Sequence, residues 1–149
     1  MTTPRIDPFR VYNFRLEIDQ FQTAPVFSSV SGLTSTGTAV PYRTGADIQQ
    51  NPRQLLGLRT YGPIVLTRGM ASDTALWDWY NRIATGVPDR RNGSVILMNE
   101  SRADVLRWDF ENAWPNTITG PTLDAAANTV ALEVLSLVVE GIVLSLAGS

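Results

Sequence analysis

The chain has 149 residues, of which 44% are hydrophobic and 17% are charged, and its net charge is −2. This length fits one domain with a sizeable core, and the composition excludes a wholly disordered chain. The absence of Cys and His removes disulfides, thiolate nucleophiles, the usual general base and the commonest metal ligand. All twelve basic residues are arginines scattered without a basic stripe, so we do not expect a nucleic-acid-binding surface.

The N-terminal half is predicted to form strands separated by one long loop. Apolar and polar residues alternate over Tyr12–Asp19, which is typical of a half-buried strand. Shorter strands are predicted at Val26–Leu33, at Thr38–Arg43 and at Pro63–Arg68. Thr44–Gly57 is rich in Gly, Asp, Gln and Asn without periodicity, so it is predicted to be a loop. Loops of this length in compact domains are usually functional.

One helix is predicted, over Asp73–Gly86. Ser72 or Asp73 can cap its N-terminus, and Gly86 stands where a C-cap belongs. One wide apolar face, which we expect to pack into the core, is formed by Leu76, Trp77, Trp79, Tyr80 and Ile83.

The C-terminal half is predicted to contain further strands. Asn92-Gly93 and Asn99–Ala103 predict turns on either side of a short strand at Val95–Met98. Alternation over Leu106–Trp114 predicts the next strand, and Pro115–Asn128 is predicted to be a loop. The final strand is predicted at Thr129–Val139, and both of its faces are apolar, which favours burial on both sides or an interface. Glu133 and Glu140 argue against a membrane helix in this part of the chain, so strand plus tail is preferred.

Few residues could carry chemistry. Asp109 and Glu111 share one strand face, about 6–7 Å apart, and paired carboxylates can hydrolyse glycosides. Arg107 beside them favours an ordinary solvated strand face instead. The serines of the segment 28–31 have no His to activate them, and the glycines fit no phosphate-binding pattern. We therefore expect no catalytic, cofactor-binding or metal-binding residues, and an assembly or binding protein rather than an enzyme.

Seven blocks, taken in order, resemble one family. They are DPFRVYNFRLEID, FSSVSGL, LLGLRTYGPIVLTRG, DTALWDWYN, RRNGSVILM, WDFENAWPNTITGPTLDA and ALEVLSLVVEG, and they span about Asp7 to Gly141. The set resembles the tail tube proteins of contractile-tailed phages and related contractile injection systems. The Gly-Leu-x-x-Tyr-Gly block, the Leu-Trp-x-Trp helix and the Asn-Ala-Trp-Pro block are jointly the most specific part of the resemblance.

This resemblance implies a mainly β fold in a single tail tube domain over residues 1–149. Two antiparallel sheets would pack as a small β-barrel or sandwich with one flanking α-helix, as in tail tube and Hcp-like proteins. Six copies would form a ring in which one sheet per subunit joins a continuous inner barrel. Four strands per subunit would give about 24 strands and a diameter of roughly 45–50 Å, too wide for side chains to fill. The expected subunit edge strand carries Val130, Leu132, Val134 and Leu137.

The resemblance also implies contact segments and partners. The loop at 44–57 corresponds to the ring-to-ring contact of the family, with Arg43, Asp47, Ile48, Arg53, Leu55 and Leu56 as expected contact residues. The segment 1–10 is a second expected contact, through Ile6, Phe9 and Arg10. The tail 142–149 is expected on the ring exterior, where the sheath docks. Further implied partners are baseplate, spike and tail-terminator proteins and an effector protein or DNA as cargo, with no cofactor and no specific small-molecule ligand.

Many relatives carry acidic residues where this chain has Ser29, Pro41 and Thr44, so the charge of its lumen is left open. A type VI secretion tube protein is an alternative, although the Leu-Trp-x-Trp helix and the Trp-Pro block favour the phage-tail branch. A baseplate-proximal tube initiator also fits. Outside the family, the alternatives are a carboxylate glycosidase and a carbohydrate-binding β-sandwich with exposed tryptophans. The first ten residues contain no apolar signal segment, so synthesis in the cytoplasm and incorporation into a virion tail or injection particle are expected.

Overall fold

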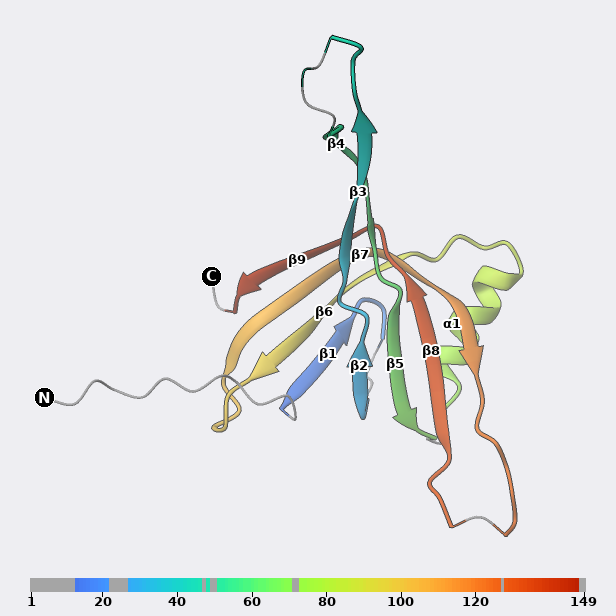
Figure 1. Cartoon of the computed structure of the whole chain (residues 1–149). Helices are drawn as coiled ribbons and strands as arrows, with labels where there is room; N and C mark the ends of the chain where they lie inside the picture. Colours follow the sequence, from blue (N-terminus) through green and yellow to red (C-terminus); the bar gives the residue numbers. More distant parts are fainter. Residues whose placement is uncertain are drawn as a thin grey trace, which may run out of the picture.

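The computed structural model describes residues 13–21, 27–46, 48, 51–70, 73–126 and 128–147. The residues Ile6, Phe9, Arg10 and Asp47, which are predicted to make contacts, lie outside these ranges. The described part is mainly β, as predicted, with one helix (Figure 1). The elements are β1 (Phe14–Ile18), β2 (Ser29–Ser31), β3 (Ser35–Tyr42), β4 (Arg53–Tyr61), β5 (Ile64–Gly69), α1 (Ala75–Ala84), β6 (Arg91–Met98), β7 (Asp104–Thr119), β8 (Leu132–Val138) and β9 (Gly141–Leu146).

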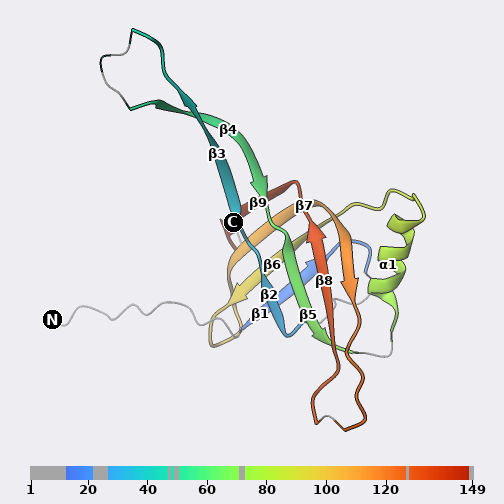
Figure 2. The same ribbon diagram turned by 45° about the vertical axis from the view of Figure 1, so that its right-hand side comes forward.

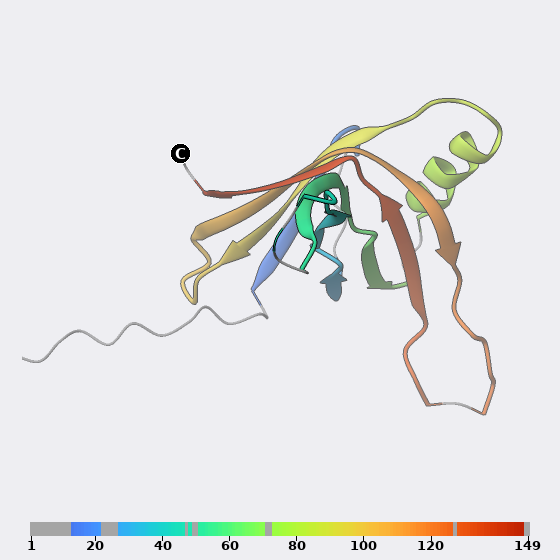
Figure 3. The same ribbon diagram turned by 45° about the horizontal axis from the view of Figure 1, so that its top comes forward.

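Seven strands form an antiparallel sheet that the long strand β7 divides into two layers. The first half of β7 pairs with β6 and β9, and β6 also pairs with β1; we call these strands layer A. The second half of β7 pairs with β8, which pairs with β5, which pairs with β2; we call these strands layer B. Figure 3 shows β7 bending from one layer into the other. The predicted pair of antiparallel sheets is confirmed as a sandwich rather than a closed barrel.

The core lies between the two layers. Leu16 of β1 and Phe110 of β7 come from layer A, and Leu66 of β5 and Leu135 of β8 come from layer B; all four are buried. Because side chains alternate across a strand, each layer contributes every second residue to this core.

The helix α1 packs against β7 and the core. Trp79 is 0% exposed and Leu76 is 1% exposed, whereas Ile83 is partly buried against the core. Trp77 and Tyr80 are half-buried and pack edge to face with ring centroids 6.4 Å apart. The helix is shorter than the predicted Asp73–Gly86. Asp73 Oδ1 accepts the N–H of Ala75 at 3.2 Å, and Gly86 follows the helix with φ +89°.

The prediction of a loop over Thr44–Gly57 is wrong for its last five residues, which lie in β4. Strand β4 begins at Arg53 and pairs with β3, with Val40 opposite Leu55. The two strands form a separate hairpin that projects away from both layers (Figure 2). Since neither face of the hairpin is buried, its sequence lacks the alternation that marks a half-buried strand.

The predicted turn at Asn92-Gly93 is wrong, because both residues lie inside β6. A Cβ at Gly93 would lie 2.5 Å from the Phe110 ring and 2.5 Å from the backbone oxygen of Glu17, so this position requires glycine for close packing. The predicted loop at Pro115–Asn128 is also wrong at its start, since β7 continues to Thr119 across a bulge.

Strand β8 is not the last strand and is not an edge strand. It pairs with β5 on one side and β7 on the other, so the expected subunit edge carrying Val130, Leu132, Val134 and Leu137 is wrong. The predicted tail contains β9, which pairs back along the first half of β7. Within the ranges that the structure describes, no helix has the length and hydropathy needed to cross a membrane.

Candidate assembly surfaces

The β3–β4 hairpin exposes large apolar side chains. Ile48 is 99% exposed, Leu56 97% and Leu58 84%, and Leu55 is about half exposed. Arg43 and Ile48 lie in the connection between the strands, whereas Arg53, Leu55 and Leu56 lie on β4. The structure therefore places the described residues of the predicted ring contact on one projecting element. Exposed apolar patches of this kind mark interaction sites.

Open strand edges form a second surface. Within the two layers as described, β1, β2 and β9 each pair on one side only, and the second half of β7 pairs only with β8. Strand β9 also exposes Val143, Leu144 and Leu146. Unpaired apolar edges promote pairing with another chain unless they are covered. These strands, rather than β8, are the candidate sites of edge pairing between subunits.

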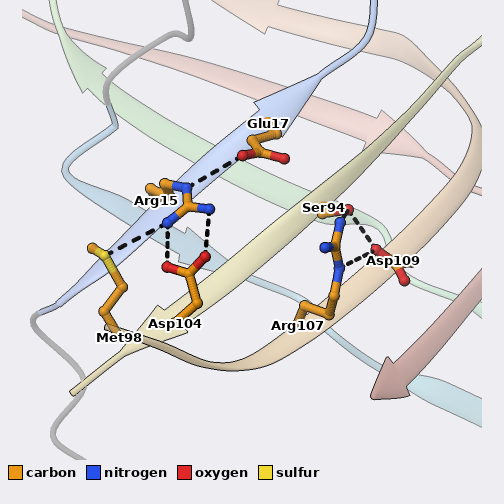
Figure 4. A network of polar contacts seen from close by, with 7 residues as sticks. All are labelled: Arg15, Glu17, Ser94, Met98, Asp104, Arg107 and Asp109. Carbon is orange, nitrogen blue, oxygen red and sulfur yellow. Dashed lines mark hydrogen bonds and ion pairs between the residues drawn. The ribbon is translucent and has the colours of Figure 1, made fainter. Parts of the chain in front are cut away.

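The outer face of layer A carries a network of ion pairs (Figure 4). Arg15 of β1 makes a two-pronged ion pair with Asp104 of β7, with Nη2 donating to Oδ2 at 2.6 Å, and its Nε donates to Glu17 at 3.3 Å. The hydrogen bond from Arg15 lowers the pKa of Asp104. Pairs of this kind on an exposed face are worth little stability, but they fix the charge pattern of the surface.

Asp109 lies at the centre of the other half of this network. It accepts a short hydrogen bond from Ser94 Oγ and one from Arg107 Nε at 3.0 Å. The bond from Ser94, followed by Arg107, lowers the pKa of Asp109. The lowered pKa keeps Asp109 ionised, which does not suit the general acid of a glycosidase pair, and the hydrogen bonds from Ser94 and Arg107 fit the ordinary strand face that Arg107 favours.

The outer face of layer B has a different character, because two rows of uncharged side chains cross it. Strand register places Ser31, Val65, Ser136 and Thr117 in one row and Ser29, Thr67, Val134 and Thr119 in the next. The alternate residues of β5 and β8 are buried, so these rows face outwards. One side of the sandwich is therefore ion-paired, and the other carries hydroxyl and valine side chains.

A buried cation fixes the helix to layer A. The Arg91 guanidinium donates to both carboxylate oxygens of Asp89, at 3.1 and 2.9 Å. It also lies 4.7 Å from the Phe21 ring centroid and 4.8 Å from that of Trp79, whose Nε1 donates to the Asp89 carbonyl at 2.8 Å. Sequence reasoning missed this cluster. The one signal in the sequence was Arg91, the first residue of β6, with Asp89 two residues before it.

In the described ranges, no group of three or more carboxylates lies in an arrangement that could hold a metal ion. What the described residues offer is surface: a projecting apolar hairpin, open strand edges, and two outer faces of different charge. This combination defines an assembly protein.

The comparisons with known proteins agree with this class. A family model described as the T4-like virus tail tube protein gp19 matches residues 10–143. The chain belongs to this family of tail tube proteins. The search of curated proteins found no match.

Solved structures of contractile systems are similar over nearly the whole chain. One, from the sheath–tube complex of the extracellular contractile injection system PVC in its extended state, is 26% identical with a TM-score of 0.83, covering 94% of this chain and 93% of that chain. Another, from the tube-terminating cap of the anti-feeding prophage, is 24% identical with a TM-score of 0.85. The match covers 99% of this chain and 97% of that chain. Hcp1 from Flavobacterium johnsoniae shares the fold at 15% identity and a TM-score of 0.52, covering 91% and 96%.

Proposed function

We propose that this tail tube protein forms hexameric rings that stack into the rigid, hollow inner tube of a contractile phage tail or contractile injection system. The observation that carries the proposal is the family match over residues 10–143. The similarity to a chain of the PVC sheath–tube complex, over 94% of this chain, supports the same role. The protein would act through rigidity and an open bore, as a structural component without catalysis.

Ring closure is the physical reason for this assembly. Each layer has four strands, counting β7 in both, and both layers end in an edge that is unpaired within the described chain. Pairing between neighbouring subunits removes such edges when the ring closes. Six subunits with four strands each make a barrel of about 24 strands with an aqueous channel.

Layer B is the layer that we assign to the bore. Strands β3 and β4 continue the directions of β2 and β5, with Gly62 N–H donating to the Thr34 carbonyl at 2.9 Å where the hairpin joins the sandwich (Figure 1). A hairpin that bridges rings therefore extends layer B from ring to ring. The two uncharged rows would then line the channel, so cargo, whether an effector protein or DNA, would pass without ion pairing to these rows.

The other partners follow from the same assembly. Structures similar to this chain come from a sheath–tube complex, a baseplate and a tube-terminating cap. We infer that the ring exterior docks a contractile sheath, and that the two ends of the tube meet a baseplate with its spike and a terminator.

A second candidate is a tube protein of the type VI secretion kind or a baseplate-proximal initiator. Similarity to three Hcp structures and to a type six secretion system protein reaches TM-scores of 0.51–0.59 at 9–15% identity, which supports the shared fold only. Tubes many rings long, formed by this chain alone, would favour a main tube protein over an initiator.

The test is assembly of the purified full-length chain, followed by sedimentation velocity and negative-stain microscopy. We expect hexamers at moderate concentration and hollow tubes at high concentration. A stable monomer at high concentration, without rings, would contradict the proposal.

The bore assignment has its own test, because the chain has no native Cys. In tubes of biotin-labelled Ser136→Cys, the label should be shielded from streptavidin until the tubes are dissociated. The matched variant Val143→Cys places the label on the outer face of layer A and should bind streptavidin in intact tubes. The reverse pattern would assign layer A to the bore.

A further inference from the structure

The sandwich is incompletely closed between the edge strands β1 and β2. A hollow of about 540 Å³ lies there, and we call it the socket. Its apolar lining comes from both layers: Phe14, Leu97 and Trp108 from layer A, and Val30 and Leu33 from the region of β2. These side chains are only half-buried, although Val30, Leu33 and Trp108 pack against the core. The core therefore continues to the surface at this point, without a cover from the described residues.

The hairpin presents the opposite feature. Leu56 and Leu58 are 97% and 84% exposed, two residues apart on β4, and neither belongs to the core cluster. In Figures 1 and 2 the hairpin rises from one end of the body, while β1 and β2, which frame the socket, lie towards the other end. The hairpin of one molecule cannot fold back into its own socket, because its strands run directly away from it.

Charge also favours contact between the hairpin and the body of another copy. The segment 35–61 contains three arginines and one aspartate, so its net charge is +2. The whole chain has a net charge of −2, which leaves −4 on the remainder. The positively charged hairpin is thus attracted to the negatively charged body of another copy, over a distance that the salt concentration sets by screening.

We propose that Leu56 and Leu58 of one subunit occupy the socket of a subunit in the next ring, entering it along the ring axis, between the β1 and β2 edges that pair within the ring. This inference rests on the proposed stacking of rings and identifies where the hairpin is received. The contact is heterologous, because a surface at one end of the chain meets a different surface at the other end. A heterologous contact that runs along the ring axis does not close on itself, so it propagates and gives a tube of open length.

A cysteine pair tests this contact, since the wild-type chain contains no Cys. Ser28 is exposed and lines the socket, and Leu56 is more exposed than Leu58. Tubes of the variant Leu56→Cys/Ser28→Cys should give a ladder of disulfide-linked oligomers on oxidation, because each chain links to two others. Single variants should give no ladder. The matched pair Leu56→Cys/Val143→Cys moves the second thiol to the outer face of layer A and should also give none.

Tubes that form but give no ladder would overturn the inference. So would efficient intramolecular linkage in Ile6→Cys/Ser28→Cys, because the N-terminal segment would then fill the socket. A wild-type chain that forms neither rings nor tubes would contradict the proposed function and this inference together, so the two failures are distinguishable.

A second measurement does not depend on disulfide geometry. The variant Leu56→Asn/Leu58→Asn changes exposed side chains only, so rings should persist while the yield of tubes falls at least tenfold. The control Leu123→Asn alters another exposed leucine, 83% exposed in the β7–β8 connection, and should leave the yield unchanged. Equal yields from both variants would exclude the hairpin leucines from stacking.

Discussion

Arg68 of β5 donates a hydrogen bond from Nε to Oε2 of Glu133 on β8 at 2.9 Å, with the two residues 5% and 1% exposed. Arg68 also donates to Asp73 Oδ1 at 3.0 Å, just before α1. This ion pair ties two neighbouring strands of layer B to the start of the helix. Glu133 Oε1 has no hydrogen-bond partner in the described part of the chain, so the pair is only partly satisfied.

Removing one member of this pair is expected to destabilise the fold strongly. Glu133→Ala leaves the buried Arg68 cation with only Asp73 as a partner, whose side chain is 53% exposed, and breaking a buried pair typically costs about 3–5 kcal/mol. The double variant Arg68→Met/Glu133→Leu replaces both charges with apolar groups and should recover most of that loss. Urea unfolding of the unassembled chain measures the free energy of unfolding of each variant. If the double variant loses as much of it as Arg68→Met and Glu133→Leu lose together, this account of the pair is refuted.

The two tryptophans of the helix are expected to differ. Trp79 is fully buried and its Nε1 donates to the Asp89 carbonyl, so Trp79→Ala should destabilise the fold by about 3–5 kcal/mol. Trp77 is half-buried, so Trp77→Ala should cost clearly less. Thermal melting compares them, and two variants that melt like the wild type would show that α1 is not packed as described.

The cluster around Arg91 makes a similar prediction with an internal control. Arg91→Met leaves the Asp89 carboxylate, 3% exposed, without its two-pronged partner and should cost about 3–5 kcal/mol. Arg82 also contacts Asp89, at 3.4 Å, but its side chain is 55% exposed, so Arg82→Met should cost about 0–1 kcal/mol. Arg91→Lys should not restore stability, because lysine lacks the planar fork that pairs with the carboxylate and stacks on the rings. Equal losses from the Arg91 and Arg82 variants would contradict this ranking.

Acid should weaken the folded chain. Hydrogen bonds from Arg68, Arg15 and Ser94, respectively, lower the pKa values of Asp73, Asp104 and Asp109 below the ordinary 3.8. A lowered pKa in the folded state adds stability above the ordinary value and loses it as the pH falls towards the lowered one. Urea unfolding between pH 5 and pH 2 should show this loss as a fall in the free energy of unfolding. Asp104→Asn should make that free energy depend less steeply on pH. Arg15→Gln, which removes the partner, should reduce this pH dependence equally; a pH dependence unchanged in both variants would exclude this pair as a source.

The tip of the hairpin is expected to matter for stacking and not for folding. Replacing residues 47–53 with a short Gly-Ser linker should leave the melting temperature of the ring nearly unchanged, since closure of a loop depends weakly on its length. Rings should form but not stack. Full-length tubes from this variant would place the stacking energy outside the hairpin tip, in Leu56 and Leu58 or in the N-terminal segment 1–10.

The sequence predicts strands well where one face of a strand is buried. Over β1, Leu16 and Ile18 alternate with exposed polar residues, and the same pattern marks the first half of β7. In the hairpin, the strand predicted at Thr38–Arg43 overlaps β3, but the first residues of β4 are predicted as loop. Both faces of the hairpin are exposed, so no burial imposes a period of two on β4.

Long-range pairing could not be read from local patterns. The partners Arg68 and Glu133 are separated by 65 residues, and Arg15 and Asp104 by 89. Strand β8 reads as a doubly apolar edge strand, yet it lies between β5 and β7, and Leu137 on one of its faces is buried in the core. The socket was not predictable either, since its lining comes from β1, β2, β6 and β7, and only the fold brings these elements together.

A cryo-EM reconstruction of tubes assembled from the full-length chain tests the central claim most directly. We predict six subunits per ring, layer B lining the bore, and the β3–β4 hairpin of each subunit seated against β1 and β2 of a subunit in the next ring. Layer A lining the bore, or a chain that yields no hollow tube under any assembly condition, would contradict the account.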